Sequence, residues 1–477
     1  MKAKLILPAL REARSPGYRP IKYSLFPPLG LMTLAAHLAP DDQITLEDEH
    51  VEPLQLDDTP DLVVIQCYIT SARRSYQIAD HYRKQRVHVA MGGLHPSSLP
   101  FEALRHADTV FVGPGDQTFP EFLRDFRGGG ARRLYRSRGR TLVGLPPPRR
   151  DLMRRELYLA PNSLVVSRGC PGRCDFCYQE SFYRGGRSYY TGRVDAALAE
   201  IESLPGRHLF FLDDHLFASP RFARELLAGM RGMNRIWQAA GTVSSILAPG
   251  LVELGAEVGL RSLFVGFETL SQPNLALCGK RQDARVGYAE AIRKLHALGV
   301  MVNASFVFGM DHDDESVFDR TVDFAVEEGI ETATFHILTP YPVTRLFDRL
   351  EREERIICRD WDRYDTRHTV FRPAHLPAAA LEAGYRRAYE RFYAWGSIFR
   401  SALSQPTLPG RLRHLAYTVG WKKLEPLWNL VIRARQVGRA VPLLEATLEG
   451  FGRRQAAGGR SQSSLRTLPM VDADDAA

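Results

Sequence analysis

The sequence predicts an α/β protein with three parts: a doubly wound, Rossmann-like N-terminal domain, a partial barrel of six β/α units, and a C-terminal helical extension. Short apolar runs rich in β-branched residues alternate with amphipathic helical patterns over residues 1–125 and again over residues 161–340. Such runs are typical of strands buried on both faces of a parallel sheet. Residues 126–160 break the alternation with a triple glycine, many arginines and a triple proline, which indicates a linker.

The same patterns set the expected elements and boundaries. Residues 1–125 form the first domain, with strands expected at 5–9, 61–69, 87–93 and 108–115. Residues 161–375 form the barrel, with strands expected at 163–167, 208–212, 236–243, 261–267, 300–308 and 331–337. Residues 376–451 are amphipathic and helical, and residues 452–477 are polar and predicted to be disordered. Both α/β folds bind ligands at the carboxyl ends of their strands.

Composition and charge exclude several classes of protein. The chain has 477 residues, of which 44% are hydrophobic and 25% charged, as in ordinary globular proteins. It contains no run of about 18 apolar residues, so we expect no spanning helix, no secretory signal and a cytoplasmic location. The net charge is +8. Tyr135 is the only aromatic residue among the arginines of 132–155, which favours a solvated linker over a nucleic-acid groove.

Three of the six cysteines are crowded into one short segment. SRGCPGRCDFCYQ (167–179) places Cys170, Cys174 and Cys177 in a CxxxCxxC pattern just after the first barrel strand. Thiolates suit iron–sulfur clusters or zinc. A structural zinc site normally has four protein ligands, and no comfortable fourth ligand is close in sequence. A 4Fe-4S cluster is therefore favoured over zinc, with one iron left open for another ligand.

This segment resembles the signature of radical SAM enzymes, CxxxCxΦC, in which Φ is aromatic and is filled here by Phe176. The resemblance implies that the open iron binds the amino and carboxylate groups of S-adenosylmethionine (SAM). An electron from the cluster then splits SAM to a 5′-deoxyadenosyl radical.

Further SAM contacts are implied by the same resemblance. Asp213 and Asp214 would meet the methionine end of SAM, Glu268 the ribose, and Gly309 the adenine. Judged from the residues alone, the two aspartates could instead cap a helix, and Glu268 could be half of a buried ion pair.

The N-terminal domain resembles the cobalamin-binding domain that precedes many radical SAM cores. The matching stretches are 26–38, 63–72, 89–104 and 110–123. The residues that the resemblance assigns to cobalamin are Tyr68, Thr70, Ser71, Gly92, Gly93, Gly113 and Gly115. The DxHxxG motif, whose histidine ligates cobalt, is absent. We therefore expect either cobalt without a protein histidine or a domain that has lost cobalamin, and we expect His95 to be a loop hydrogen-bonding residue.

The function implied is that of a cobalamin-dependent radical SAM methyltransferase, which methylates an unactivated carbon through a 5′-deoxyadenosyl radical and methylcobalamin. The C-terminal extension is similar to that of a subset that includes hopanoid methylases. The expected partners are a small-molecule or lipid-like substrate and an electron donor such as flavodoxin or ferredoxin, and no nucleic acid. His336, Tyr341 and Glu331 are candidates to line the substrate cavity.

Two alternatives remain open. The first keeps both cofactors but catalyses cyclisation or rearrangement without methyl transfer. The second is a non-catalytic iron–sulfur electron-transfer or sensor protein, in which Cys278 or Cys358 supplies a fourth ligand. Trp395, Trp421 and Trp428 are compatible with a lipid or a peripheral membrane contact, although packing of helices on the barrel is favoured.

Overall fold

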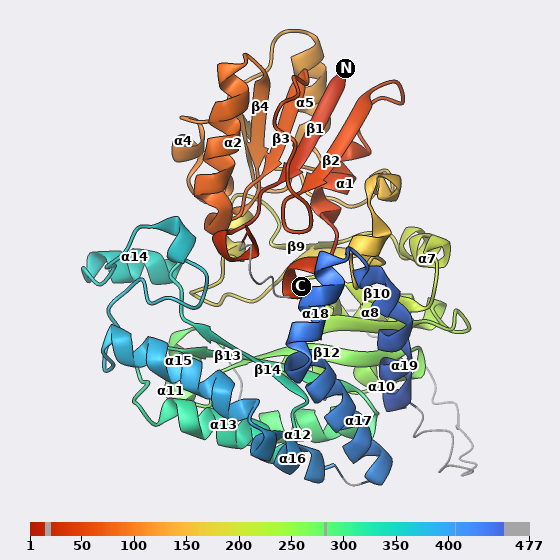
Figure 1. Cartoon of the computed structure of the whole chain (residues 1–477), viewed down its shortest axis with the longest axis vertical. Coiled ribbons are helices and arrows are strands. Elements are labelled where there is room, and N and C mark those ends of the chain that lie inside the picture. Colours follow the sequence, from red (N-terminus) through yellow and green to blue (C-terminus); the bar gives the residue numbers. More distant parts are fainter. Residues whose placement is uncertain (15–20, 281–283, 406, 453–477) are drawn as a thin grey trace, which may run out of the picture.

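The computed structural model describes residues 1–14, 21–280, 284–405 and 407–452 and confirms the predicted fold class. Two six-stranded sheets lie one above the other, and the C-terminal helices pack along the lower one (Figure 1). The predicted disordered tail falls outside the described residues, apart from its first residue, which ends the last helix.

The N-terminal sheet is parallel throughout, in the order β2-β1-β3-β4-β5-β6. Its strands are β1 (Lys2–Leu7), β2 (Gln43–Asp48), β3 (Leu62–Gln66), β4 (His88–Gly92), β5 (Thr109–Val112) and β6 (Leu134–Arg136). Its helices are α1 (Leu29–Ala35), α2 (Ala72–Lys84), α3 (Leu94–Ser98), α4 (Pro100–Ala103) and α5 (Thr118–Arg127). The central strands β1 and β3 are almost wholly buried, which explains the apolar run of β3 and of the second half of β1.

The sequence analysis missed both edge strands of this sheet. β2 is half-exposed and polar, so it lacks the apolar run of a buried strand. β6 lies inside the segment expected to be a linker and pairs with β5. Residues 126–160 are therefore not a linker throughout, because their first part completes the N-terminal sheet.

The second sheet is also parallel, in the order β14-β13-β12-β11-β10-β7, and β7 does not pair with β14, so the barrel is open. Its strands are β7 (Ser163–Leu164), β10 (His208–Phe211), β11 (Ile236–Gly241), β12 (Leu260–Glu268), β13 (Met301–Phe308) and β14 (Thr332–Ile337). Its helices are α6 (Gln179–Phe182), α7 (Val194–Ser203), α8 (Pro220–Gly229), α9 (Val243–Leu247), α10 (Leu251–Glu257), α11 (Gln272–Leu277), α12 (Ala284–Ala297), α13 (Val317–Glu327) and α14 (Arg345–Arg352).

The C-terminal extension closes the free edge of β14. It comprises α15 (Ala378–Phe392), α16 (Trp395–Leu403), α17 (Leu408–Thr418), a short π-helix (Val419–Lys423), α18 (Glu425–Arg433) and α19 (Val441–Gly452). The hydroxyl of Tyr393 accepts a hydrogen bond from the backbone N–H of Ala333 and donates one to its carbonyl, and Tyr389 does the same at Phe335. These bonds satisfy an edge that would otherwise expose unpaired backbone groups.

A short antiparallel pair, also unforeseen, flanks the cysteine segment: β8 (Ser167–Gly169) and β9 (Tyr189–Thr191). Gly169 ends β8 with a φ of 82°, and a Cβ added there would lie 1.9 Å from the carbonyl oxygen of Ser188. Only glycine fits this position, and it directly precedes Cys170.

We expect Gly169→Ala to destabilise the protein more than Gly185→Ala. Gly185 lies in the segment between β8 and β9 and has a φ of 80°, but a Cβ added there would have no atom within 4 Å. Alanine at this position therefore costs only the free energy of the left-handed backbone conformation, about 1–2 kcal/mol. Gly169→Ala adds a steric overlap with backbone. Thermal unfolding and limited proteolysis of both variants test this, and equal losses of stability would contradict the packing argument.

Candidate active site between the barrel and the N-terminal domain

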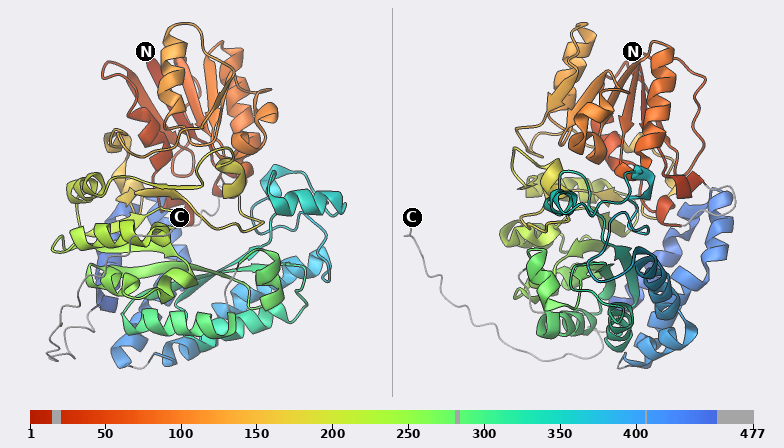
Figure 2. Two further views of the ribbon diagram at one scale, coloured as in Figure 1. Left: turned by 180° about the vertical axis from the view of Figure 1, so that it is seen from behind. Right: turned by 90° about the vertical axis from the view of Figure 1, so that its left-hand side faces the viewer.

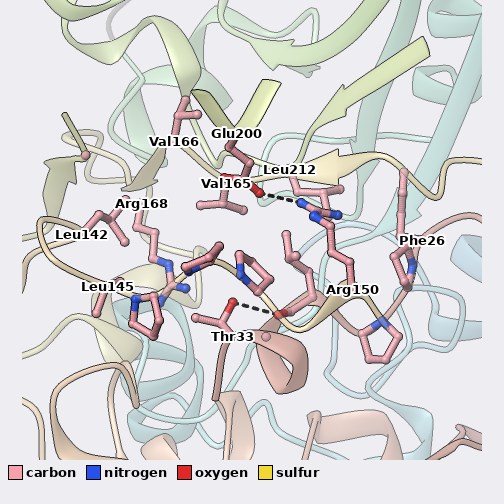
Figure 3. Close-up of a pocket in the computed structure, with 18 of the residues that line it drawn as sticks. Phe26, Thr33, Leu142, Leu145, Arg150, Val165, Val166, Arg168, Glu200 and Leu212 are labelled. Carbon is pink, nitrogen blue, oxygen red and sulfur yellow. Dashed lines mark hydrogen bonds and ion pairs between the residues drawn. The ribbon is translucent and has the colours of Figure 1, made fainter. Parts of the chain in front are cut away.

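The carboxyl ends of both sheets face one cavity of about 1000 Å³. Leu7 and Gln66 line it from the N-terminal sheet, and Val165 and Leu212 line it from the barrel. Figure 3 shows the apolar side chains of Val165 and Leu212 at this cavity. It also shows Arg150 directed at Glu200, and these two side chains form an ion pair at 2.6 Å. The cavity is therefore formed jointly by the two domains.

A second cavity of about 430 Å³ adjoins the first, because Lys22, Tyr23, His50 and Tyr68 line both. Five tyrosines line the smaller cavity: Tyr23, Tyr68, Tyr178, Tyr341 and Tyr364. Tyr178 directly follows Cys177, and Tyr68 follows β3. This space is therefore bounded on one side by the cysteine segment and on the other by the N-terminal domain.

The three cysteines lie in the loop between β8 and α6, and all are partly exposed. Burial raises the pKa of Cys174 to about 11 and that of Cys177 to about 12, and the charges of the other cysteines add to the rise. The thiols are thus near neighbours. Among the described residues, however, no three His, Cys, Asp or Glu side chains converge tightly enough for a single metal ion. A four-iron cluster takes each thiolate on a different iron, so the donor set fits a cluster better than one zinc.

Asp213 lies just after β10 and is held by the backbone of the neighbouring strands. It is 3% exposed, and its carboxylate accepts hydrogen bonds from the backbone N–H groups of Val166 and Ser167 and from the Ser167 hydroxyl. Burial raises the pKa of Asp213 to about 7 despite these donors. Asp213 fastens the start of β8 to the end of β10, and its contact with SAM stays a prediction.

Asp214 and Glu268 stay at the mouth of the barrel. Asp214 accepts hydrogen bonds from the backbone N–H of Gly169 (2.9 Å) and the hydroxyl of Tyr178 (3.1 Å), on either side of the cysteines. Glu268 has a φ of 65°, a strained value for a non-glycine residue, and pairs with Lys280 at 2.6 Å. Burial alone would lower the pKa of Lys280, but the charge of Glu268 raises it above its usual value.

Three residues near the cysteines were missed or misjudged from sequence. Lys280 is one, and its charge favours the thiolate of Cys174. His215 is another: its Nδ1 lies 3.8 Å from Cys170 Sγ, and burial lowers its pKa to about 4. The third is Cys278, which is far from the cysteine loop in sequence. Its carbonyl nevertheless accepts a hydrogen bond from the N–H of Asp175 inside that loop. Its thiol is turned to its own helix, where it donates to Leu275 O at 3.4 Å.

The remaining SAM candidates lie beside the same strand ends. Phe176 packs against an apolar cluster that includes Val307 and Met310 at the end of β13. Gly309 follows that strand with a φ of 96°, and a Cβ there would lie 2.7 Å from the side chain of Leu381 on α15. Packing against α15 therefore favours glycine at this position independently of any contact with adenine, and the sequence alone does not show this.

The cobalamin candidates divide into two groups. Tyr68 and Thr70 line the smaller cavity. Ser71 is buried and donates to the carbonyl of Tyr68. Neither cavity is lined by the four candidate glycines, Gly92, Gly93, Gly113 and Gly115. A Cβ at each would instead meet protein: Phe111, Cys67, Ser137 and Leu34, respectively. Packing alone requires glycine only at Gly93, where a Cβ would lie 2.7 Å from the carbonyl oxygen of Cys67, because the other three distances are 3.2–3.4 Å.

The histidines near the cavity have protein partners. His95 is 1% exposed, and its Nε2 lies 2.8 Å from the hydroxyl of Tyr76 and 3.0 Å from Glu102. His336 lies on β14 with Nδ1 3.1 Å from the hydroxyl of Thr366, and burial lowers its pKa to about 4, so it is neutral at pH 7. Glu331 does not line either cavity; it is buried and pairs with His296 at 3.2 Å.

Comparison with known proteins agrees with this arrangement. The family model for the radical SAM superfamily matches residues 164–325, that for the B12 binding domain matches residues 23–123, and a domain of unknown function, DUF4070, matches residues 344–438. The bacteriochlorophyllide d C-12(1)-methyltransferase of Chlorobaculum tepidum is 27% identical over 80% of this chain and 85% of its own length. The hopanoid C-2 methylase of Rhodopseudomonas palustris is 24% identical over 71% of this chain and 66% of its own.

Two solved structures share the fold at low identity. The radical SAM methyltransferase TsrM from Kitasatospora setae matches with a TM-score of 0.63 and 16% identity, over 96% of this chain and 100% of that one. The cobalamin-dependent S-adenosylmethionine radical enzyme OxsB matches with a TM-score of 0.65 and 14% identity, over 94% of this chain and 75% of that one. With the CxxxCxΦC loop at a strand end, the chain combines a B12-binding domain, over residues 23–123, with a radical SAM core, over residues 164–325.

Proposed function

We propose that this protein is a cobalamin-dependent radical SAM methyltransferase that transfers a methyl group to carbon in a small-molecule or lipid-like substrate. One observation carries the proposal: Tyr178, next to the cysteine loop, and Tyr68, at the end of β3 in the B12-binding domain, line the same 430 Å³ cavity. A substrate held there lies between the two cofactor sites. When bound, cluster and SAM supply a radical and cobalamin supplies the methyl group.

Cys170, Cys174 and Cys177 would hold the 4Fe-4S cluster and leave its fourth iron to SAM. Asp214 would accept a hydrogen bond from the SAM amino group, and Glu268 from a ribose hydroxyl, because both carboxylates stand at strand ends beside the cysteines. Phe176 and Gly309 would flank the nucleoside. Lys280 orients Glu268 and places a positive charge beside the thiolates.

The larger cavity is proposed to hold cobalamin, with Tyr68 and Thr70 contacting it from the smaller one. The cobalt would have no protein histidine ligand, since His95 is tied to Tyr76 and Glu102, and His50, which lines both cavities, is held through Nδ1 by Asp48. The relatives named as a methyltransferase and a methylase support methyl transfer as the outcome. A flavodoxin or ferredoxin would supply the electron.

The aromatic lining of the smaller cavity excludes water from the reacting atoms, which protects a radical from side reactions. Tyr341, in the segment that follows β14, lines this cavity and is a candidate to orient the substrate, whereas His336 on β14 lines neither cavity. The lining also argues for a largely apolar substrate in this space.

Replacing Cys170, Cys174 and Cys177 together with alanine should abolish binding of iron and sulfide after anaerobic reconstitution, because the cluster then has no thiolate ligands. Iron and sulfide assays with electron paramagnetic resonance measure this. Cys278→Ser is the matched control and should keep the full cluster. Loss of the cluster in the control would favour the four-cysteine electron-transfer alternative, and stoichiometric zinc without iron would exclude the cluster.

Asp214→Asn and Glu268→Gln should each weaken SAM binding by about 1.5–3 kcal/mol, since each removes a charge-assisted hydrogen bond. SAM titration of the reconstituted protein, normalised to iron content, gives the affinity. Asp213→Asn should instead lower the unfolding temperature while leaving SAM affinity unchanged, because its carboxylate fastens β8. The roles are misassigned if Asp214→Asn and Glu268→Gln bind SAM like the parent protein.

Reconstituted enzyme supplied with cobalamin, reductant and SAM carrying a trideuteriomethyl group should transfer that group to carbon in a candidate metabolite. Mass spectrometry of pigment and lipid extracts from the source cells identifies the product. A cobalamin-free sample is the control and should give no labelled product. A product that lacks the label but has gained a ring would establish the cyclase alternative instead.

A further inference from the structure

The C-terminal helices expose an unusual amount of apolar side chain. Nine of the fourteen exposed large hydrophobic side chains among the described residues lie between 395 and 443. We call these nine the C-terminal apolar surface: Trp395, Phe399, Leu403, Leu408, Leu412, Leu424, Leu427, Leu430 and Leu443. Monomeric proteins rarely expose apolar groups at such density without a partner.

Helix periodicity gathers these residues on particular faces. Trp395, Phe399 and Leu403 are four residues apart on α16, and they are 52%, 51% and 63% exposed. Between them, Ile398 and Ala402 are buried on the opposite side of the helix, toward the body of the protein. The outer face of α16 is therefore largely exposed, while its inner face is packed.

Contacts connect α16 with the next helices. The rings of Trp395 and Phe399 are stacked at 6.1 Å, and the ammonium of Lys423 lies 5.3 Å from the Trp395 ring. Lys423 ends the π-helix that leads into α18, and Leu424 follows it. The C-terminal helices lie across the front of the lower half in Figure 1 and along the right-hand edge of that half in the right-hand view of Figure 2.

Basic residues are interleaved with these apolar groups. Residues 395–452 contain eight Lys or Arg and only three Glu, with no Asp. The combination of exposed Trp, Phe and Leu with surrounding Lys and Arg is that of interfacial helices on anionic lipid. A symmetric dimer through this surface would bring the same basic residues face to face, which disfavours a second copy as the partner.

We propose that the C-terminal apolar surface docks this protein on an anionic membrane. Among the described residues, no helix has both the length and the apolarity to span a bilayer, so the contact is peripheral. α18 packs against residues 21–24, of which Lys22 and Tyr23 line both cavities. The docked surface therefore adjoins the wall of the candidate active site, which suits a substrate drawn from the bilayer.

The proposal is tested by sedimentation of the full-length protein with vesicles of phosphatidylglycerol and of phosphatidylcholine. Binding should favour phosphatidylglycerol and fall as salt is added, because the attraction is partly electrostatic. The double variant Trp395→Ser/Phe399→Ser should weaken binding about tenfold or more. Lys423→Glu should weaken binding to phosphatidylglycerol about fivefold or more.

Phe101→Ser is the matched control, because Phe101 is 73% exposed on α4 of the N-terminal domain, away from this surface. It should leave vesicle binding unchanged. Circular dichroism confirms that each variant is folded, and iron content shows that the radical SAM core is intact whatever the result. Absence of binding to phosphatidylglycerol vesicles, or equal loss in the control, overturns the proposal. A dimer in sedimentation equilibrium that Trp395→Ser/Phe399→Ser dissociates would overturn it in favour of self-association.

Discussion

Two adjacent carboxylates at the end of β10 hold the segment on which the chemistry depends. Asp213 accepts hydrogen bonds from the backbone of Val166 and Ser167, and Asp214 accepts one from the backbone of Gly169. Together they pin β8, which is only three residues long and would not be stable alone. Because Cys170 follows β8 directly, the position of the cysteine loop relative to the barrel rests on this anchoring.

The same short strand also connects the two domains. Arg168, between Ser167 and Gly169, forms an ion pair with Asp116 in the loop that follows β5 of the N-terminal sheet. Both residues are largely buried from solvent, so the pair is shielded and geometrically constrained. Tyr178, after the cysteines, donates to Asp214 and lines the smaller cavity. One segment thus carries the three cysteines proposed as cluster ligands, contacts the N-terminal domain through an ion pair and forms a wall of the proposed substrate site.

The C-terminal extension has a structural task apart from any docking. A half-open barrel leaves β14 as an edge, and its backbone groups are satisfied by Tyr389 of α15 and by Tyr393, which directly follows that helix. The segment before α15 reaches the N-terminal domain, where Trp361 donates to Glu102, the carboxylate that also holds His95. The extension therefore covers the open side of the barrel, the segment that precedes it contacts the N-terminal domain, and the outer faces of α16 and α18 stay largely exposed.

The sequence by itself determined the fold class, the main strands and the cysteine loop. Buried parallel strands require continuous apolar runs, and cluster ligation by a local loop requires cysteines at fixed short spacing, so both leave local signals. Edge strands such as β2 and β6 leave weak signals, because their pairing partner rather than their own composition makes them strands.

Only the tertiary structure decided which polar residues face the site. Asp213 and Asp214 are neighbours with the same side chain, yet one anchors β8 from a buried position and the other flanks the cysteines. Lys280, His215 and Cys278 are distant from the cysteines in sequence and reach them through the closing of separate β/α units. Such proximity depends on the packing of the whole barrel, which no local pattern encodes.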